Sequence, residues 1–233
     1  MRFETDIITD MDIKDLIQEI PIFNPLSEPD LLRLTANSRI KHFKKNRFIY
    51  RPAEECQNLY FLIDGTIKVG CSSQDGREVI KNILHPRAMF GEECLFGHGE
   101  FSDFAKVISA GATLLVIRAE EFKRLMAANI ELNFNVFNML GKKLKKTETR
   151  LESLIFNDAR TRIINFIKDN AKNFGRQVGF EMLLKHSLTQ QDIANYTGTS
   201  RQTVTSVLND LKKSNQIYFK RKSILIRDMA TLS

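Results

Sequence analysis

The chain has 233 residues, of which 42% are apolar, enough to bury a core in one large domain or two smaller ones. Its formal net charge is +7, and the excess lies in the last third. Residues 158–233 hold 13 Lys and Arg against 6 Asp and Glu, whereas residues 1–157 hold 22 of each sign. This asymmetry favours a phosphate-bearing partner, although a basic surface that only aids solubility remains an alternative.

The N-terminal sequence and the cysteines bear on compartment and metal content. The start, MRFETDIITDMD, has no basic region followed by an apolar stretch, and no segment approaches the roughly 18 apolar residues of a membrane span. We therefore expect a cytoplasmic protein with no membrane contact. Cys56, Cys71 and Cys94 lie far apart without a C-x-x-C pair, which argues against a disulfide framework, a zinc site and an iron–sulfur cluster. Packing is their expected role.

Helical spacing precedes a region of strands. Apolar positions within 13–20 and 31–34 recur as they do on one face of a helix, which predicts two short helices. From residue 43 to 117, short runs rich in Val, Ile, Phe and Tyr are punctuated by glycine, which predicts an antiparallel barrel or roll. Asp64-Gly65 and Asp75-Gly76 are each predicted to form a hairpin turn, because glycine accepts the positive φ that such turns need.

A heptad pattern follows the strand region. Six residues recur at alternating spacings of three and four, so the helix that carries them is able to pair with a second copy of itself. An amphipathic helix that packs on its own domain remains the alternative. The predicted dimer interface consists of Phe137, Leu140, Leu144, Thr147, Leu151 and Leu154.

The stretch TQQDIANYTGTSRQTVTSVL at 189–208 is typical of a helix-turn-helix. Thr189 and Ser200 suit the first positions of two helices, and Gly198 suits the turn between them. An apolar stripe on the second helix leaves Arg201 and Gln202 on its outer face. Arg pairs with guanine and Gln with adenine in the major groove, which predicts that the partner is double-stranded DNA.

Two final apolar runs flank a basic turn and complete the outline of a winged helix. We expect the basic turn to contact phosphate, and the alternative is a run of solvated charges. For the second helix of the helix-turn-helix, the alternative is a polar face that has no role in DNA binding. The predicted DNA-binding residues are Thr189, Gln190, Ser200, Arg201, Gln202, Thr203, Thr205, Ser206, Lys220, Arg221 and Lys222.

The order of these parts resembles that of the Crp/Fnr family over nearly the whole chain. FGEECLFG in the strand region, an Ala-Asn start into the heptad helix, and TQQDIANYTGTSRQTVTSVLNDL follow one another as they do in that family. The resemblance implies an α+β protein with an N-terminal β-roll (a cyclic-nucleotide-binding-like jelly roll) over 1–128, a long dimerisation helix over 129–157 and a C-terminal winged helix-turn-helix over 158–233.

The resemblance also implies a function: a homodimeric transcription regulator that reads a palindromic site and contacts RNA polymerase. Arg201, Gln202 and Ser206 fall where the family places its base contacts. Members that respond to cyclic AMP typically carry Arg, Glu and Arg at those places, so this chain keeps only the first. We therefore expect a different DNA target.

An effector pocket is implied by the same resemblance, and the chain retains half of it. Family sites for cyclic nucleotides use a Gly-Glu pair and, about ten residues later, an Arg-Ser pair. Gly91-Glu92 matches the first pair, whereas Ser102-Asp103 replaces the second with a hydroxyl and a carboxylate. A carboxylate opposes a phosphate that needs a cation, which argues against cyclic AMP as the effector by the usual contacts.

On the heptad helix, Thr147 matches a family position for the purine base, and Glu148 stands beside it in place of Ser. A fold-preserving role for these residues, in a pocket that is empty or adapted to another ligand, remains the alternative. The candidate pocket residues are Gly91, Glu92, Glu93, Cys94, Ser102, Asp103, Thr147 and Glu148.

Single histidines and cysteines bear on other possible effectors. Haem stays open, with axial candidates at His42, His85, His98 and His186, although scattered histidines are more often surface or core residues. The family's iron–sulfur sensors carry clustered N-terminal cysteines, which do not occur here. Cys94 is either a thiol sensor or a buried inert cysteine.

The sequence contains no nucleophile–base pair and no metal constellation. It also contains no phosphate-binding loop, because the glycine-rich stretch GEECLFGHG lacks the Gly-Lys-Ser ending and lies among strands. We therefore expect no catalytic residues and no enzymatic activity. A β-roll signalling module that does not regulate DNA is the remaining alternative.

Overall fold

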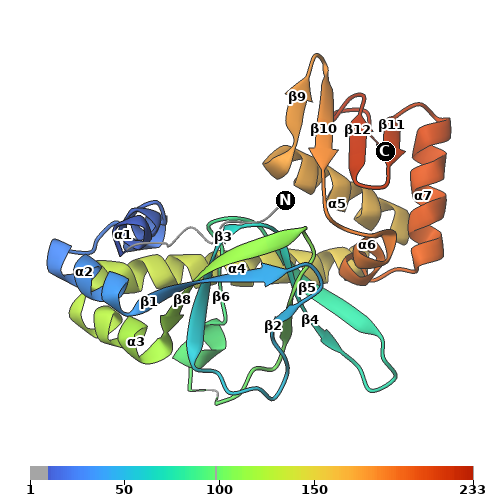
Figure 1. Cartoon of the computed structure of the whole chain (residues 1–233). Coiled ribbons are helices and arrows are strands. Elements are labelled where there is room, and N and C mark those ends of the chain that lie inside the picture. Colours follow the sequence, from blue (N-terminus) through green and yellow to red (C-terminus); the bar gives the residue numbers. More distant parts are fainter. Residues whose placement is uncertain (1–9, 98, 233) are drawn as a thin grey trace. The chain divides into compact units, whose positions relative to one another are not determined.

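The computed structural model describes residues 10–97 and 99–232 and contains both helices and antiparallel strands (Figure 1). The α+β fold class predicted from the sequence is therefore confirmed. The chain forms two compact units. The N-terminal unit comprises the residues up to Cys71 together with Ile83–Lys143, and the C-terminal unit comprises Ser72–Asn82 and the residues from Leu144 onward.

Two short helices open the N-terminal unit, as the spacing of apolar residues predicts. Ser27 caps the second helix, because its hydroxyl accepts a hydrogen bond from the backbone N–H of Asp30. Pro29 lies in the first turn, where its missing N–H removes no helical hydrogen bond. The elements are α1 (Asp10–Gln18), a 3-10 turn η1 (Pro21–Phe23) and α2 (Glu28–Ala36).

Two four-stranded sheets follow, built of antiparallel pairs such as β1 with β8 and β4 with β7. The first sheet has the order β1 (Ser38–Lys44), β8 (Gly111–Arg118), β3 (Asn58–Asp64) and β6 (Met89–Phe90). The second has the order β2 (Phe48–Tyr50), β7 (Phe104–Val107), β4 (Ile67–Ser72) and β5 (Glu78–Leu84).

Strand β3 is buried on both of its faces, which explains its continuous apolar run. Leu59 and Phe61 pack into a core shared with the helices, whereas Tyr60 and Leu62 pack into a second core formed with the other sheet. Successive side chains of a strand point to opposite faces, so a strand between two cores needs apolar residues at every position.

The hairpin predicted at Asp64-Gly65 is wrong. β3 pairs with β8 and β6, and β4 pairs with β7, so the two strands that flank this turn belong to different sheets. Gly65 has a φ of 102°, and an added Cβ would lie 2.5 Å from the carbonyl oxygen of Gly111. The glycine does mark a tight turn, but positive φ is a local property that says nothing about which strands pair.

The second predicted hairpin exists in a longer form. β4 and β5 are hydrogen-bonded neighbours, and the connection between them runs from Ser73 to Arg77. Gly76 has a φ of 81°, as the prediction requires. Hydrogen bonds from the N–H of Ser73 to the carbonyl of Arg77 and from the N–H of Gly76 to that of Ser73 close the loop.

The remaining elements are helices and one small sheet. In chain order they are α3 (Ala119–Ala128), α4 (Ile130–Phe156), α5 (Ala159–Phe174), β9 (Arg176–Val178), β10 (Glu181–Lys185), α6 (Gln190–Thr197), α7 (Arg201–Lys213), β11 (Ile217–Lys220) and β12 (Ser223–Ile226). The last four strands form a sheet in the order β11, β12, β10, β9. The region between α5 and α6 is a hairpin of β9 and β10 that extends this sheet.

The C-terminal unit has the winged-helix outline that the sequence predicts, with α6 and α7 followed by the β11–β12 hairpin. Helix α4 contributes residues to both compact units. Within the described ranges, none of the helices combines the length and the apolar character that a membrane span requires.

Candidate DNA-reading unit and effector region

Both helices of the predicted helix-turn-helix begin at caps that the sequence indicates. The Thr189 hydroxyl accepts from the N–H of Asp192 at 3.0 Å, and the Asp192 carboxylate accepts from the N–H of Thr189 at 2.9 Å, which completes a capping box. Ser200 accepts from the N–H of Thr203 at 3.0 Å and caps α7. Gly198 ends α6 with a φ of 64°. The start of α7 is therefore fixed by local sequence.

Helix α7 buries one side and exposes the other. Its apolar stripe is buried, as predicted, and so are Ile193 and Ala194 of α6, the helix that contacts it. Arg201, Gln202 and Ser206 are exposed on the opposite face of the first two turns. The buried stripe consists of Val204, Val207, Leu208 and Leu211.

Some of the predicted contact residues bind one another. Thr205 donates its hydroxyl hydrogen to Oε1 of Gln190 at 2.8 Å, which joins α7 to the first turn of α6. The hydroxyls of Ser200 and Thr203 lie 2.8 Å apart. The first contact joins the two helices and the second lies within the start of α7, so these side chains bind within the motif.

Two arginines that the sequence reasoning missed hold the end of α6. Arg162 of α5 donates to the carbonyls of Asn157 at 2.6 Å, Thr197 at 2.9 Å and Gly198 at 3.2 Å. Arg150 of α4 donates to the carbonyl of Tyr196, and its guanidinium lies 4.3 Å from the centre of the Tyr196 ring. Cations are favourable at the C-terminal carbonyls of a helix, so this pair steadies the turn between α6 and α7.

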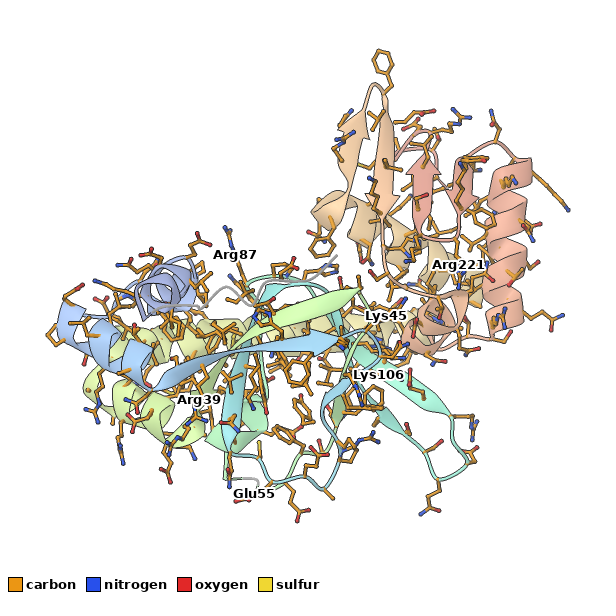
Figure 2. The ribbon with its side chains drawn as sticks, in the orientation of Figure 1. Arg39, Lys45, Glu55, Arg87, Lys106 and Arg221 are labelled. Atoms are coloured by element: carbon orange, nitrogen blue, oxygen red, sulfur yellow. The ribbon has the colours of Figure 1, made fainter. Side chains whose placement is uncertain are left out.

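The β11–β12 hairpin presents the predicted basic turn. Lys220, Arg221 and Lys222 are exposed, and Figure 2 labels Arg221. The N–H of His186 donates to the carbonyl of Lys222 at 3.0 Å, which ties the turn to the segment before α6. Lys220 Nζ lies 5.9 Å from the centre of the Tyr218 ring.

Helix α4 carries apolar side chains that are exposed. Phe137, Leu144 and Leu151 repeat every seven residues and are 62%, 62% and 59% exposed. Leu154 is also exposed, whereas Leu140 packs against the core of the N-terminal unit. An exposed apolar row of this kind marks an interaction surface. Four further exposed members of the helix were missed in the sequence, namely Ile130, Phe134, Ile155 and Phe156.

The sequence itself indicates that Ile130 and Phe134 belong to this row of apolar residues. They continue the spacing of three and four upstream from Phe137. We call this row, from Ile130 to Leu154, the α4 apolar face.

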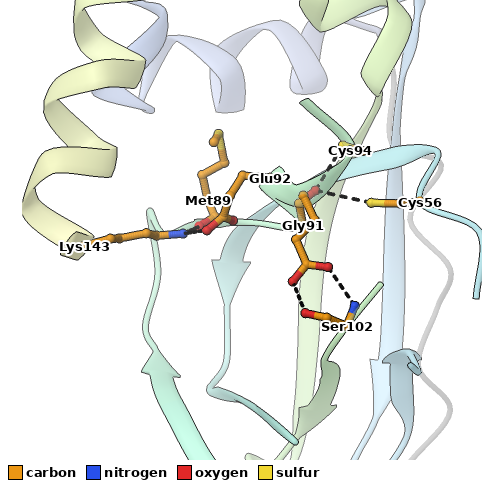
Figure 3. Close-up of polar contacts among 8 residues, drawn as sticks. Cys56, Met89, Gly91, Glu92, Cys94, Ser102 and Lys143 are labelled. Carbon is orange, nitrogen blue, oxygen red and sulfur yellow. Dashed lines mark hydrogen bonds and ion pairs between the residues drawn. The ribbon is translucent and has the colours of Figure 1, made fainter. Parts of the chain in front are cut away.

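The predicted effector residues of the N-terminal unit lie around the turn at Gly91. This glycine has a φ of 79°, and an added Cβ would lie 2.9 Å from the Tyr60 ring. It begins the 3-10 turn η2 (Glu92–Leu95). Oε1 of Glu92 accepts a hydrogen bond from Nζ of Lys143 at 2.7 Å, and the same ammonium group donates to the carbonyl of Met89 at 2.9 Å (Figure 3).

Carboxylates gather in this region. Glu93 accepts from the N–H of Ser102 at 2.8 Å and from its hydroxyl at 2.7 Å, and Asp103 is buried. The pKa of the Tyr50 hydroxyl is raised first by burial and then by the negative charges of Glu92, Asp103 and Glu93. The carboxylates of Glu92, Glu93 and Asp103 therefore all act on the Tyr50 hydroxyl.

The other two predicted pocket residues are on helix α4. Thr147 and Glu148 are exposed and belong to the C-terminal unit. Their part in a pocket with Gly91 stays a prediction.

The histidines predicted as candidate haem ligands belong to different segments of the chain. His42 lies on β1, and its Nδ1 is 3.0 Å from the hydroxyl of Thr113 on β8. His85 follows β5, and His186 precedes α6. His98 lies outside the described residues. Across residues 10–97 and 99–232, no three His, Cys, Asp or Glu side chains are grouped as a metal ion would require.

Comparison with known families gives two matches, one in the N-terminal part of the chain and one in the C-terminal part. The cyclic nucleotide-binding domain family matches residues 40–129, and the Crp-like helix-turn-helix domain family matches residues 161–233. The first range contains the β-roll strands except for the first two residues of β1, and the second contains the winged helix.

Relatives match over nearly the whole chain. A CRP-like cAMP-activated global transcriptional regulator of Mycobacterium tuberculosis is 29% identical over 94% of this chain and 97% of its own length. The global nitrogen regulator of a Nostoc species is 26% identical over 83% of this chain and 87% of its own.

Solved structures share the fold. FixK2 from Bradyrhizobium japonicum superposes with a TM-score of 0.75 at 19% identity and covers 84% of this chain and 95% of its own. A CooA mutant from Carboxydothermus hydrogenoformans superposes with a TM-score of 0.72 at 25% identity, over 84% of this chain and 87% of its own. The chain therefore belongs to the Crp/Fnr family and is a transcription regulator with a helix-turn-helix DNA-binding domain.

Proposed function

We propose that the protein acts as a homodimer that reads a palindromic DNA site through Arg201, Gln202 and Ser206. The observation that carries this proposal is the exposed N-terminal face of α7, which lies opposite a buried stripe and starts at a fixed cap. The N-terminal part of a recognition helix is the part that enters the major groove. Arg201 is suited to O6 and N7 of guanine and Gln202 to adenine.

Phosphate contacts come from the ends of the helices and from the hairpin turn. Thr189 and Ser200 stand at helix N-termini, where backbone N–H groups attract anions. Lys220, Arg221 and Lys222 supply exposed positive charge in the turn after β11. Gln190, Thr203 and Thr205, which were predicted to contact DNA, are engaged in hydrogen bonds within the motif, and we assign them the role of positioning α7.

The α4 apolar face supports dimerisation. Exposed Phe137, Leu144 and Leu151 form a heptad row that a second copy of the helix would cover. Two recognition helices must lie about 34–36 Å apart to enter successive major grooves, so a dimer is also what a palindromic site requires. The boundaries at 128 and 157 remain our division into sensor, dimerisation helix and DNA-binding domain.

We propose further that cyclic AMP is not bound by the contacts usual in the family. Glu92 is paired with Lys143, and Asp103 is a buried carboxylate where a phosphate would need a cation. Titration calorimetry of the full chain with cyclic AMP tests this. We expect no heat of binding, whereas affinity in the micromolar range would refute it.

The wider setting follows from this function. We propose a cytoplasmic regulator that contacts RNA polymerase, has no enzymatic activity and responds to an effector other than cyclic AMP. A signalling module that does not bind DNA is the competing function, and the basic C-terminal third speaks against it.

The experiment is selection of bound sequences from a random DNA duplex pool, followed by gel shifts at several salt concentrations. A palindromic consensus and an affinity that falls steeply with salt are expected, because phosphate contacts release counterions. Retention of no sequence above background would refute the function.

A further inference from the structure

Two cysteines of the N-terminal unit point at one carbonyl oxygen. Sγ of Cys94 donates to the carbonyl of Gly91 at 3.0 Å, and Sγ of Cys56 lies 3.9 Å from the same oxygen (Figure 3). Each thiol also contributes to the pKa shift of the other, as expected of two neighbouring sulfurs. They are far apart in sequence, so the fold alone brings them together.

The two thiols differ in their access to solvent. Cys94 lies in η2 and is only 3% exposed, whereas Cys56 lies in the connection between β2 and β3 and is half-buried. Backbone hydrogen bonds hold both positions: the N–H of Cys56 donates to the carbonyl of Gly99 at 2.9 Å, and Gly91 begins the turn that carries Cys94. The pair therefore has one accessible member and one protected member.

We propose that Cys56 and Cys94 form a redox-active dithiol that closes to an intramolecular disulfide when the protein meets hydrogen peroxide. Because Cys56 is the accessible thiol, it reacts first. Its sulfur attacks one peroxide oxygen, the O–O bond breaks, and a sulfenic acid forms as one water leaves.

The second step uses the neighbour that is already in place. Sγ of Cys94 attacks the sulfenic sulfur of Cys56, the S–S bond forms, and the hydroxyl leaves with the Cys94 proton as a second water. The two thiols lose two electrons and one peroxide gains them. In a reducing cytoplasm the dithiol is the resting form.

The surroundings set the pH dependence of this reaction. Burial raises the pKa of both thiols, that of Cys94 to about 12, and the charges of Glu92 and Glu93 raise the pKa of Cys56 further. Lys123 of α3 acts in the opposite direction on Cys94. Burial first, and then the charges of Cys56 and Cys94, raise the pKa of the Tyr60 hydroxyl on β3 to about 12. Only the thiolate attacks peroxide, so oxidation is expected to accelerate by roughly tenfold per pH unit below the pKa.

A bond at this place restrains the effector region. Turn η2 carries Glu92, which is paired with Lys143 of α4, and Glu93, which is paired with Ser102. A disulfide would tie this turn to the β2–β3 connection. The chemistry itself does not depend on which DNA site the protein reads.

Peptide mapping tests the dithiol in the full chain. The reduced protein is treated with hydrogen peroxide, remaining thiols are alkylated, and the unreduced digest is analysed by mass spectrometry. We expect a linked pair of peptides that contain Cys56 and Cys94, released by a reductant, and a higher rate at pH 9 than at pH 7.

Three matched variants complete the design. Cys56→Ser and Cys94→Ser should each abolish the linked peptide, whereas Cys71→Ser, which changes the remaining half-buried cysteine, should keep it. Circular dichroism of each variant checks that it is folded. Alkylation of both Cys56 and Cys94 after peroxide treatment, a stable sulfenic acid at Cys56 in the unchanged protein, or a bond between two chains would overturn the proposal.

Discussion

Nζ of Lys143 lies 2.7 Å from Oε1 of Glu92, so the ammonium group of this α4 residue forms an ion pair with the glutamate of Gly91-Glu92. Both side chains are less than a third exposed. The ammonium group also donates to the carbonyl of Met89 at 2.9 Å. This ion pair joins α4 to the β-roll within one chain.

Lys143→Met keeps the apolar stem and removes the ammonium group. We expect the free energy of unfolding to fall by about 1 kcal/mol, since a partly buried ion pair with one added carbonyl contact is lost. Urea unfolding followed by circular dichroism measures the change. Lys142→Met, the exposed neighbour on the same helix, should change stability by no more than about 0.5 kcal/mol. Equal losses for the two variants would show that the pair contributes nothing.

Arg162→Ala should destabilise the C-terminal unit. Its guanidinium donates to three backbone carbonyls, and a charged donor to a carbonyl contributes about 1.5–3 kcal/mol. We predict a loss of about 2–3 kcal/mol in urea unfolding and weaker DNA binding. Arg160→Ala is the control on the same helix, because its ion pair with Asp210 is 3.8 Å long and lies at the surface. A tolerated Arg162→Ala would mean that water replaces those contacts.

The stability of the protein should depend on pH through His186. Burial lowers the pKa of this imidazole below its ordinary value of 6.5, so the folded state prefers the neutral ring. The unfolded state then binds more protons between the folded pKa and 6.5. Stability is complete above pH 6.5 and is lost as the pH falls toward the folded pKa.

His186→Phe removes this proton uptake. Unfolding free energies of the two proteins at pH 7.5 and pH 5.5 give the comparison, and the unchanged protein should lose more stability over that interval than the variant. An identical loss in both would assign the pH dependence to other groups.

Leu144→Asp combined with Leu151→Asp should convert a dimer into a monomer. Both residues lie on the α4 apolar face, and covering two carboxylates in an apolar interface is costly. Sedimentation velocity measures the change in mass. Thr149→Asp places the same charge on an exposed position away from this row and should leave the dimer intact. A dimer that survives the double change would place the interface elsewhere.

The sequence predicted those parts of the fold that depend on neighbouring residues. The caps at Thr189 and Ser200 and the stripe on α7 were predictable because helix termini and helix faces have fixed spacings. The hairpin at Asp64-Gly65 was predicted wrongly, because a local turn does not determine the strand partner. The crossing from one sheet to the other depends on residues far along the chain.

The polar contacts of the candidate sites were predictable only in part. Glu92 was identified from its motif, whereas its partner Lys143 was not, because the two residues meet only after folding. For the same reason, the sequence did not predict the carbonyl contacts of Arg162 or the proximity of Cys56 to Cys94. Pairings of this kind carry no periodic signal in a single sequence.

The central claim, that α7 reads bases through Arg201, is tested most directly by measuring the affinity of Arg201→Ala for the selected site and for its single-base variants. We predict a loss of about 1–3 kcal/mol and a relaxed preference at one base pair of each half-site. Lys222→Ala serves as the contrast and should weaken binding to all sequences alike while reducing the salt slope by about 1. Unchanged affinity and unchanged base preference in Arg201→Ala would contradict the account.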